Sequence, residues 1–137
     1  MPRQRGKMVD DELRQMVLDY MEKGYLENII DMFKHDESLC PLVVDMIMDE
    51  RVRVRLGAVA LVEELVRINR EPFVRLIPVI GGLLEDPNPT LRGDAAYLLG
   101  IIRHSDALPF LINAKDDENK FAREVILDSI DDITCSN

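Results

Sequence analysis

The sequence has no tryptophan, and aromatic residues make up only 5% of its 137 residues. A hydrophobic core must therefore come from Leu, Ile, Val, Met and Ala, within a hydrophobic fraction of 47%. Leu, Met and Ala favour helices, whereas strands are enriched in aromatic and β-branched residues. The composition thus predicts a helical protein of one domain's length, large enough to bury a core without a stabilising metal or disulfide.

Cysteine is also scarce. The two cysteines, Cys40 and Cys135, form no C-x-x-C pair and no zinc-binding pattern. Cys40 lies in an apolar stretch, so we expect a buried free thiol there, and we expect Cys135 to be exposed. Nothing in this pattern indicates an oxidising compartment.

Long apolar runs are missing, since none approaches the roughly 20 residues of a membrane-spanning helix. The segment Met1 to Met8 is polar and basic and lacks the apolar centre of a secretory signal. We therefore expect no membrane association and a cytoplasmic location. The net charge of −9 disfavours nucleic acids and anionic membranes and favours a basic partner, although the same charge also serves solubility.

The N-terminal part predicts a basic tail followed by a pair of helices. Residues 1–9 carry Arg3, Arg5 and Lys7 and are predicted to be disordered. From Asp10 onward the apolar residues have helical spacing, and a second short helix after Gly24 ends near residue 35. We predict that residues 10–35 form a capping helix pair.

The rest of the chain, residues 36–137, repeats. Each of three blocks has a Pro, an Asp eight residues later, and an Arg six residues after that. These residues are Pro41, Asp49 and Arg55; Pro78, Asp86 and Arg92; and Pro109, Asp117 and Arg123. The pattern predicts three antiparallel helix pairs, at 36–70, 71–104 and 105–134, in which Pro begins the first helix and Asp caps the second.

The second helix of each block has a predicted buried stripe at the same offsets from its Arg. The stripe comprises Val54, Ala58, Leu61, Val62 and Leu65; Leu91, Ala95, Leu98, Leu99 and Ile102; and Ala122, Ile126, Ser129, Ile130 and Ile133. Ser129 alone departs from the apolar pattern. We attribute it to a weaker demand for burial in the last repeat.

This pattern of Asp, Arg, Ala and paired aliphatic residues over about residues 38–133 resembles short HEAT-like repeats, including those of phycobilin lyases. The resemblance implies an all-α, right-handed α-solenoid of about four antiparallel helix pairs, with the second helices on the concave face. It also implies that the Asp and Arg residues form a ladder between repeats. Six extra residues around Arg67 to Pro72 should lengthen a helix or loop.

Other chemistries fit the sequence poorly. A HEAT-like group resembling deoxyhypusine hydroxylase binds iron through His-Glu pairs, but neither His35 nor His104 is followed by Glu. The basic run from Arg51 to Arg55 has no interleaved aromatic residues for stacking on nucleic-acid bases. No catalytic triad or phosphate loop is apparent, and Gly81-Gly82 is better explained by close helix packing. We predict no catalytic residue, cofactor or metal.

The remaining candidate is the exposed row of the second helices, at offsets +1, +5 and +9 from each Arg. The residues predicted to bind a protein partner are Leu56, Glu64, Tyr97, Ile101, Asp128 and Asp132. Exposed Leu, Tyr and Ile on a helix face indicate an interaction surface. We predict a non-catalytic protein–protein interaction module or scaffold that binds a basic partner on the concave face. The alternatives are an enzyme or accessory resembling phycobilin lyases, and a homodimer through Val125 and Leu127 of the last helix.

Overall fold

The computed structural model describes residues 2–135, with side chains from residue 11 onward. All regular elements in this part of the chain are helices, so the predicted all-α solenoid class is confirmed. The elements are α1 (Pro2–Glu22), α2 (Leu26–His35), η1 (Glu37–Leu39), α3 (Leu42–Ile47), α4 (Val52–Ile68), α5 (Glu71–Val74), α6 (Ile77–Gly82), η2 (Leu83–Glu85), α7 (Pro89–Ile102), η3 (Ser105–Ala107), α8 (Leu108–Asn113) and α9 (Lys120–Thr134). The chain divides into two compact units, residues 1–61 and 62–137.

The first unit contains α1, α2, α3 and the beginning of α4. Its core is formed by Val17 and Met21 of α1, Ile29 and Phe33 of α2, and Met46 of α3, all buried. The helix α1 begins at Pro2 and so continues through residues for which the sequence predicted a basic tail. Pro is compatible with a first helical turn because its missing N–H has no partner there.

Gly24 ends α1, as the sequence predicted. Its φ is +90°, a left-handed conformation that glycine adopts without a steric cost. The amides of Gly24 and Tyr25 donate hydrogen bonds to the carbonyls of Met21 and Tyr20. These bonds satisfy carbonyls that the last turn of α1 leaves without helical donors.

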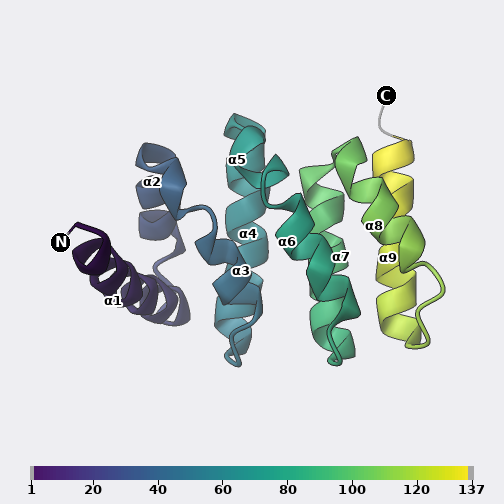
Figure 1. Cartoon of the computed structure of the whole chain (residues 1–137), viewed down its shortest axis with the longest axis horizontal. Helices are drawn as coiled ribbons and strands as arrows, with labels where there is room; N and C mark the ends of the chain where they lie inside the picture. Colours follow the sequence, from purple (N-terminus) through teal and green to yellow (C-terminus); the bar gives the residue numbers. More distant parts are fainter. Residues whose placement is uncertain (1, 136–137) are drawn as a thin grey trace. The chain divides into compact units, whose positions relative to one another are not determined.

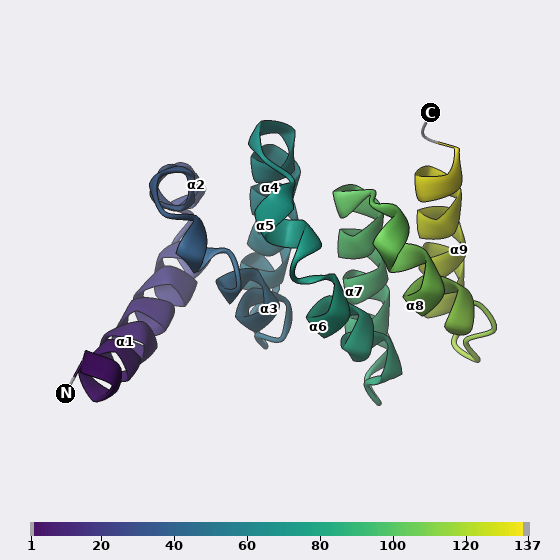
Figure 2. The same ribbon diagram turned by 45° about the horizontal axis from the view of Figure 1, so that its top comes forward.

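The second unit contains the rest of α4 and helices α5 to α9. Figures 1 and 2 show α7 and α9 side by side in one layer, with α6 and α8 in the other. The short helix α5, four residues long, overlaps the segment predicted to hold the six extra residues, and its Pro72 and Phe73 are buried. The predicted pairing of a Pro-led first helix with a longer second helix is therefore found in both α6/α7 and α8/α9.

The predicted buried stripe is found in α4, α7 and α9, with Ile130 half-buried as its one exception. The explanation given for Ser129 is wrong, because this side chain is only 2% exposed. Its hydroxyl donates a 2.7 Å hydrogen bond to the carbonyl of Ala96 on α7. A Cβ placed on Gly100 would lie 2.7 Å from the same oxygen. Ser129 is thus a small, satisfied polar residue where two helices approach closely.

Glycines allow close packing in two further places. A Cβ on Gly81 of α6 would collide with the ring of Phe110 on α8, and one on Gly93 of α7 would collide with the ring of Phe121 on α9. The sequence predicted this role for Gly81. Gly82 has open space around its Cα, so the expectation of close packing fails there.

The repeated Asp residues do not cap the second helices in the predicted way. Asp49, Asp86 and Asp117 each accept a hydrogen bond from the backbone N–H two residues later. The cap residues of α7 and α9 are Asn88 and Asn119, whose side chains accept from Thr90 N and Ala122 N. The Asp therefore lies two residues before the cap and fixes the turn that leads into it.

Candidate protein-binding surface

A buried ion pair joins the two repeats of the second unit. Arg92 Nε and Nη2 donate to the two carboxylate oxygens of Asp117 at 2.7 and 2.9 Å. Both side chains are largely buried, at 12% and 7% exposure. The remaining Nη1 of Arg92 donates to the carbonyls of Asp86 and Pro87. One guanidinium thus binds the turn of its own repeat and the carboxylate of the next.

The pKa of the Asp117 carboxyl is lowered, first by its side-chain hydrogen bonds from Arg92 and further by the backbone N–H of Asn119. This pair is the predicted ladder contact between neighbouring repeats. The hydrogen bonds of both side chains go to other groups of the same chain. The Arg92–Asp117 pair therefore holds α9 against α7 and does not offer free charge to a ligand.

The first unit uses a different arginine for the same purpose. Arg51 donates to Asp49 within its turn and to Asp19 of α1, each at 3.0 Å. Hydrogen bonds from Arg51 lower the pKa of Asp49. Arg55 and Arg123 donate to the carbonyl of the Asp six residues before them, as Arg92 does. The repeated Arg thus first stabilises its own turn.

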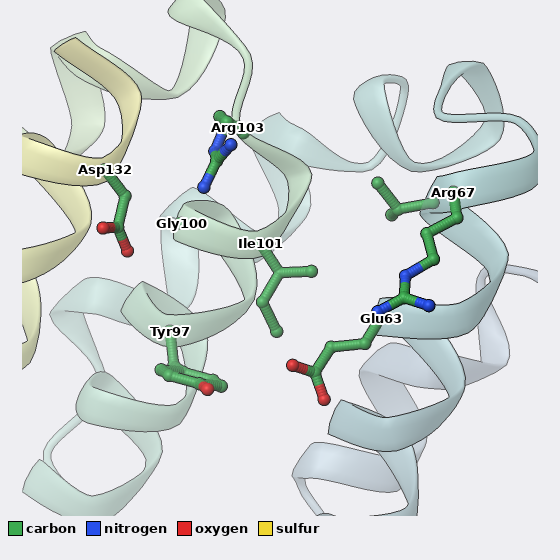
Figure 3. Close-up of a pocket in the computed structure, with 8 residues that line it drawn as sticks. Glu63, Arg67, Tyr97, Gly100, Ile101, Arg103 and Asp132 are labelled. Atoms are coloured by element: carbon green, nitrogen blue, oxygen red, sulfur yellow. The ribbon is translucent and has the colours of Figure 1, made fainter. Parts of the chain in front are cut away.

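A hollow of about 310 Å³ opens on the face formed by the second helices of the second unit. Figure 3 shows side chains from three helices around it. Its lining residues are Glu63, Val66 and Arg67 of α4, Tyr97, Gly100, Ile101 and Arg103 from α7 and its C-cap, and Asp132 of α9. The hollow therefore combines an aromatic and aliphatic centre with charges of both signs.

The hollow brings together half of the predicted binding residues. Tyr97, 46% exposed, Ile101, half-buried, and Asp132 all line it. Asp128 is exposed one turn earlier on α9, outside the lining, and Glu64 is half-buried while its neighbour Glu63 faces the hollow. Leu56 is 65% exposed and belongs to the first unit.

The charged residues of the hollow were missed apart from Asp132. Among the side chains that the structure describes, Glu63, Arg67, Arg103 and Asp132 form no ion pair or hydrogen bond with one another. These groups are therefore available to a ligand. One sequence signal was overlooked. The helix α7 ends with Arg103, at a place where a helix commonly ends with glycine.

Arg103 adopts the left-handed conformation, with φ 52° and ψ 51°, as the C-cap of α7. This conformation disfavours residues that carry a Cβ. Arg70 Nη1 donates a 2.7 Å hydrogen bond to the Arg103 carbonyl, which fixes the end of α7. This left-handed conformation ends α7 and places Arg103 in the lining of the hollow.

The histidines have local structural contacts. His35 Nδ1 is 2.8 Å from the carbonyl of Asp31, and His104 Nδ1 accepts the N–H of Asp106 at the start of η3. No cluster of three or more potential metal ligands occurs among residues 11–135, whose side chains the structure describes. Cys40 is buried and Cys135 is exposed, and neither forms a disulfide, as predicted. None of the described helices is both long and apolar enough to span a membrane.

Comparison with known protein families matches residues 49–131 to HEAT repeats. The chain belongs to the HEAT repeat family. This match begins at Asp49 and covers the three Asp–Arg turns, so it lies within the segment in which the Pro, Asp and Arg residues recur. A comparison with curated protein sequences gives no match. The hollow of this HEAT repeat protein is formed by the helices that follow those turns.

Proposed function

We propose that this HEAT repeat protein is a non-catalytic, cytoplasmic interaction module or scaffold that binds a protein partner on the second-helix face of α7 and α9. The observation that carries the proposal is the hollow, in which exposed Tyr97 and half-buried Ile101 lie beside four charged groups. Tyr is a frequent anchor of protein interfaces because its ring buries a large area and its hydroxyl keeps a hydrogen bond.

The lining indicates how a partner would be held. A hollow of about 310 Å³ has room for one large side chain or a short peptide stretch, and it lies at the lower end of the range typical of ligand pockets. An apolar partner side chain would pack on Tyr97 and Ile101. Basic groups of the partner would meet Asp132 and the nearby Asp128, while Arg67 and Arg103 would donate hydrogen bonds to a carboxylate or to carbonyls of the partner.

The proposal is tested by recovering partners from a lysate of the native host with wild-type and variant protein. A Tyr97→Ala, Ile101→Ser variant should lose the partner while keeping its helical circular dichroism. The matched control is Val79→Ser, Ile112→Ser, which removes two comparably exposed apolar side chains from α6 and α8, in the other layer. Equal recovery with both variants would refute the proposed surface.

The alternative function is an enzyme or enzyme accessory resembling the phycobilin lyases. It is distinguished by a direct measurement, since a bound tetrapyrrole absorbs visible light. If protein purified from its native host contained a near-stoichiometric amount of bound tetrapyrrole, the non-catalytic proposal would be overturned. If the double variant at Tyr97 and Ile101 also lost this absorption, the hollow would be the pigment site instead.

A further inference from the structure

Arg123 on α9 occupies the position that Arg92 occupies on α7. Arg92 donates a hydrogen bond from Nη1 to the carbonyl of Asp86 in its own turn. Its Nε and Nη2 donate to the carboxylate of Asp117 in the next repeat. Arg123 likewise donates from Nη1 to the carbonyl of Asp117, at 2.8 Å. Among the described residues no carboxylate pairs with its other two donors. The Arg123 guanidinium is therefore positioned by its Nη1 hydrogen bond, while its Nε and Nη2 have no carboxylate partner among the described residues.

The apolar residues beside Arg123 are also uncovered. On α7, which α9 covers, the residues four and seven positions after Arg92 are Ala96 and Leu99, and both are 0% exposed. On α9 the corresponding residues are Leu127, 44% exposed, and Ile130, half-buried. Arg123, Leu127, Ile130 and Asp131 have the spacing of one helical stripe. We call these four residues the α9 end face.

A further helix cannot pack on this face in the way that α9 packs on α7. The close approach at α7 depends on Gly93 and Gly100, where any Cβ would meet Phe121 or Ser129. The equivalent positions on α9 are Glu124 and Asp131, both exposed. An occupant of the end face must therefore pack at a larger distance and must tolerate acidic side chains.

Charge is segregated along α9 in a way that suits an antiparallel copy of the same helix. On the end face, Arg123 lies in the first turn, after Lys120 and before Glu124, and Asp131 lies in the second half of the helix. Asp128 and Asp132 lie off this stripe. Two such helices in antiparallel orientation place the basic end of each beside the acidic end of the other. We propose that the α9 end face binds a second copy of this chain across a twofold axis.

The twofold arrangement fixes which residues meet. With the axis between Leu127 and Ile130, each Leu127 packs against Ile130 of the other copy. Arg123 then lies about one helical turn, or ~5 Å along the axis, from Asp131 of the other copy, within reach of its long side chain. Asp131 thereby supplies the carboxylate that Asp117 supplies to Arg92. The contact is small and each copy carries a net charge of −9, so we expect a weak dimer.

Sedimentation equilibrium over a wide concentration range tests this proposal. The wild type should associate, and Arg123→Asp or Asp131→Arg should each weaken the dimer by about tenfold or more. The double variant, Arg123→Asp with Asp131→Arg, should restore the dimer. In this variant the acidic residue at position 123 pairs with the basic residue at position 131 of the other copy. Asp128→Arg is the control on the same helix and should leave association intact.

Three outcomes would overturn the proposal: a monomer at every concentration, a dimer indifferent to both single changes, or a double variant as weak as the singles. Circular dichroism checks that Arg123→Asp still folds, and Asp131→Arg changes an exposed residue in any case. The Tyr97→Ala, Ile101→Ser variant should dimerise normally, so failure of the proposed function and failure of this proposal are distinguishable.

Orientation is tested separately by disulfide cross-linking in a Cys135→Ser background. A variant with both Leu127→Cys and Ile130→Cys should form a covalent dimer on oxidation, because the two positions face each other across the axis. Each single cysteine should cross-link poorly. Efficient cross-linking of Leu127→Cys alone would indicate a parallel pair and would overturn the arrangement.

Discussion

Removing the carboxylate of Asp117 should weaken the attachment of α9 to α7. In Asp117→Ala, the Nε and Nη2 groups of Arg92 lose acceptors at 2.7 and 2.9 Å, and the backbone N–H of Asn119 loses one at 2.9 Å. The side chain of Arg92 is only 12% exposed, so water replaces these bonds incompletely. The change therefore leaves buried donors without partners.

The magnitude follows from these bonds. A hydrogen bond that involves a charged group contributes about 1.5–3 kcal/mol, and loss of one partner of a fully buried pair costs about 3–5 kcal/mol. Arg92 keeps its bonds to the carbonyls of Asp86 and Pro87 and can turn partly to solvent. We therefore expect Asp117→Ala to lower the free energy of unfolding by about 2–3 kcal/mol.

Urea unfolding followed by circular dichroism measures this loss. Asp116→Ala is the matched control, because Asp116 is the exposed neighbour and has the same charge. It should unfold close to the wild type. If Asp117→Ala unfolded together with Asp116→Ala, the Arg92–Asp117 pair would contribute nothing to the packing of these repeats and the reasoning would be refuted.

The same pair predicts a pH dependence. Hydrogen bonds from Arg92 lower the pKa of Asp117 below the ordinary value of 3.8, so the folded state binds its proton less readily than the unfolded state. The stabilisation is fully present above 3.8 and is lost as the pH falls through the folded-state pKa. The stability difference between wild type and Asp117→Asn should therefore be constant from neutral pH to about 5 and shrink below about 4.

Two further predictions concern backbone positions. Gly100→Ala should destabilise the fold by about 1–3 kcal/mol in thermal unfolding, because its Cβ would meet Ser129, whereas Gly82→Ala should be neutral or slightly stabilising; equal effects would contradict the close approach of α7 and α9. Arg103→Gly should be about 1 kcal/mol more stable than Arg103→Ala, since glycine relieves the left-handed strain, while both variants should bind the partner less tightly. Equal stability of these two variants would show that the position carries no strain.

The sequence predicted the helix pairs because burial on a helix recurs with a fixed period. The offsets from Arg55, Arg92 and Arg123 located buried positions in all three second helices. The same reasoning misjudged Ser129, since a periodic pattern distinguishes polar from apolar residues but does not give the distance between two helices. The hydrogen bond from Ser129 to Ala96 exists because Gly100 lets the helices approach, and this is a property of the packed pair.

The binding surface was predicted less completely, for a geometric reason. An error of one residue turns a side chain by about 100° around a helix, and this separates Glu64, which was predicted, from Glu63, which lines the hollow. Arg103 was missed because it follows the last helical turn of α7, where the helical offset no longer applies. Tyr97, Ile101 and Asp132 were found because they lie within regular helix.

The contacts that hold α7 in place are also those that shape the hollow. Arg92 and Asp117 connect the beginning of α7 to the turn before α9, and the Ser129–Ala96 hydrogen bond connects the middle of the two helices. Arg70 fixes the end of α7 through the Arg103 carbonyl. Tyr97 and Ile101 lie between these fixed points on α7, and Asp132 follows Ser129 by one turn of α9. A surface held at three points loses little freedom when a partner binds, so residues that never touch the partner contribute to its affinity through preorganisation.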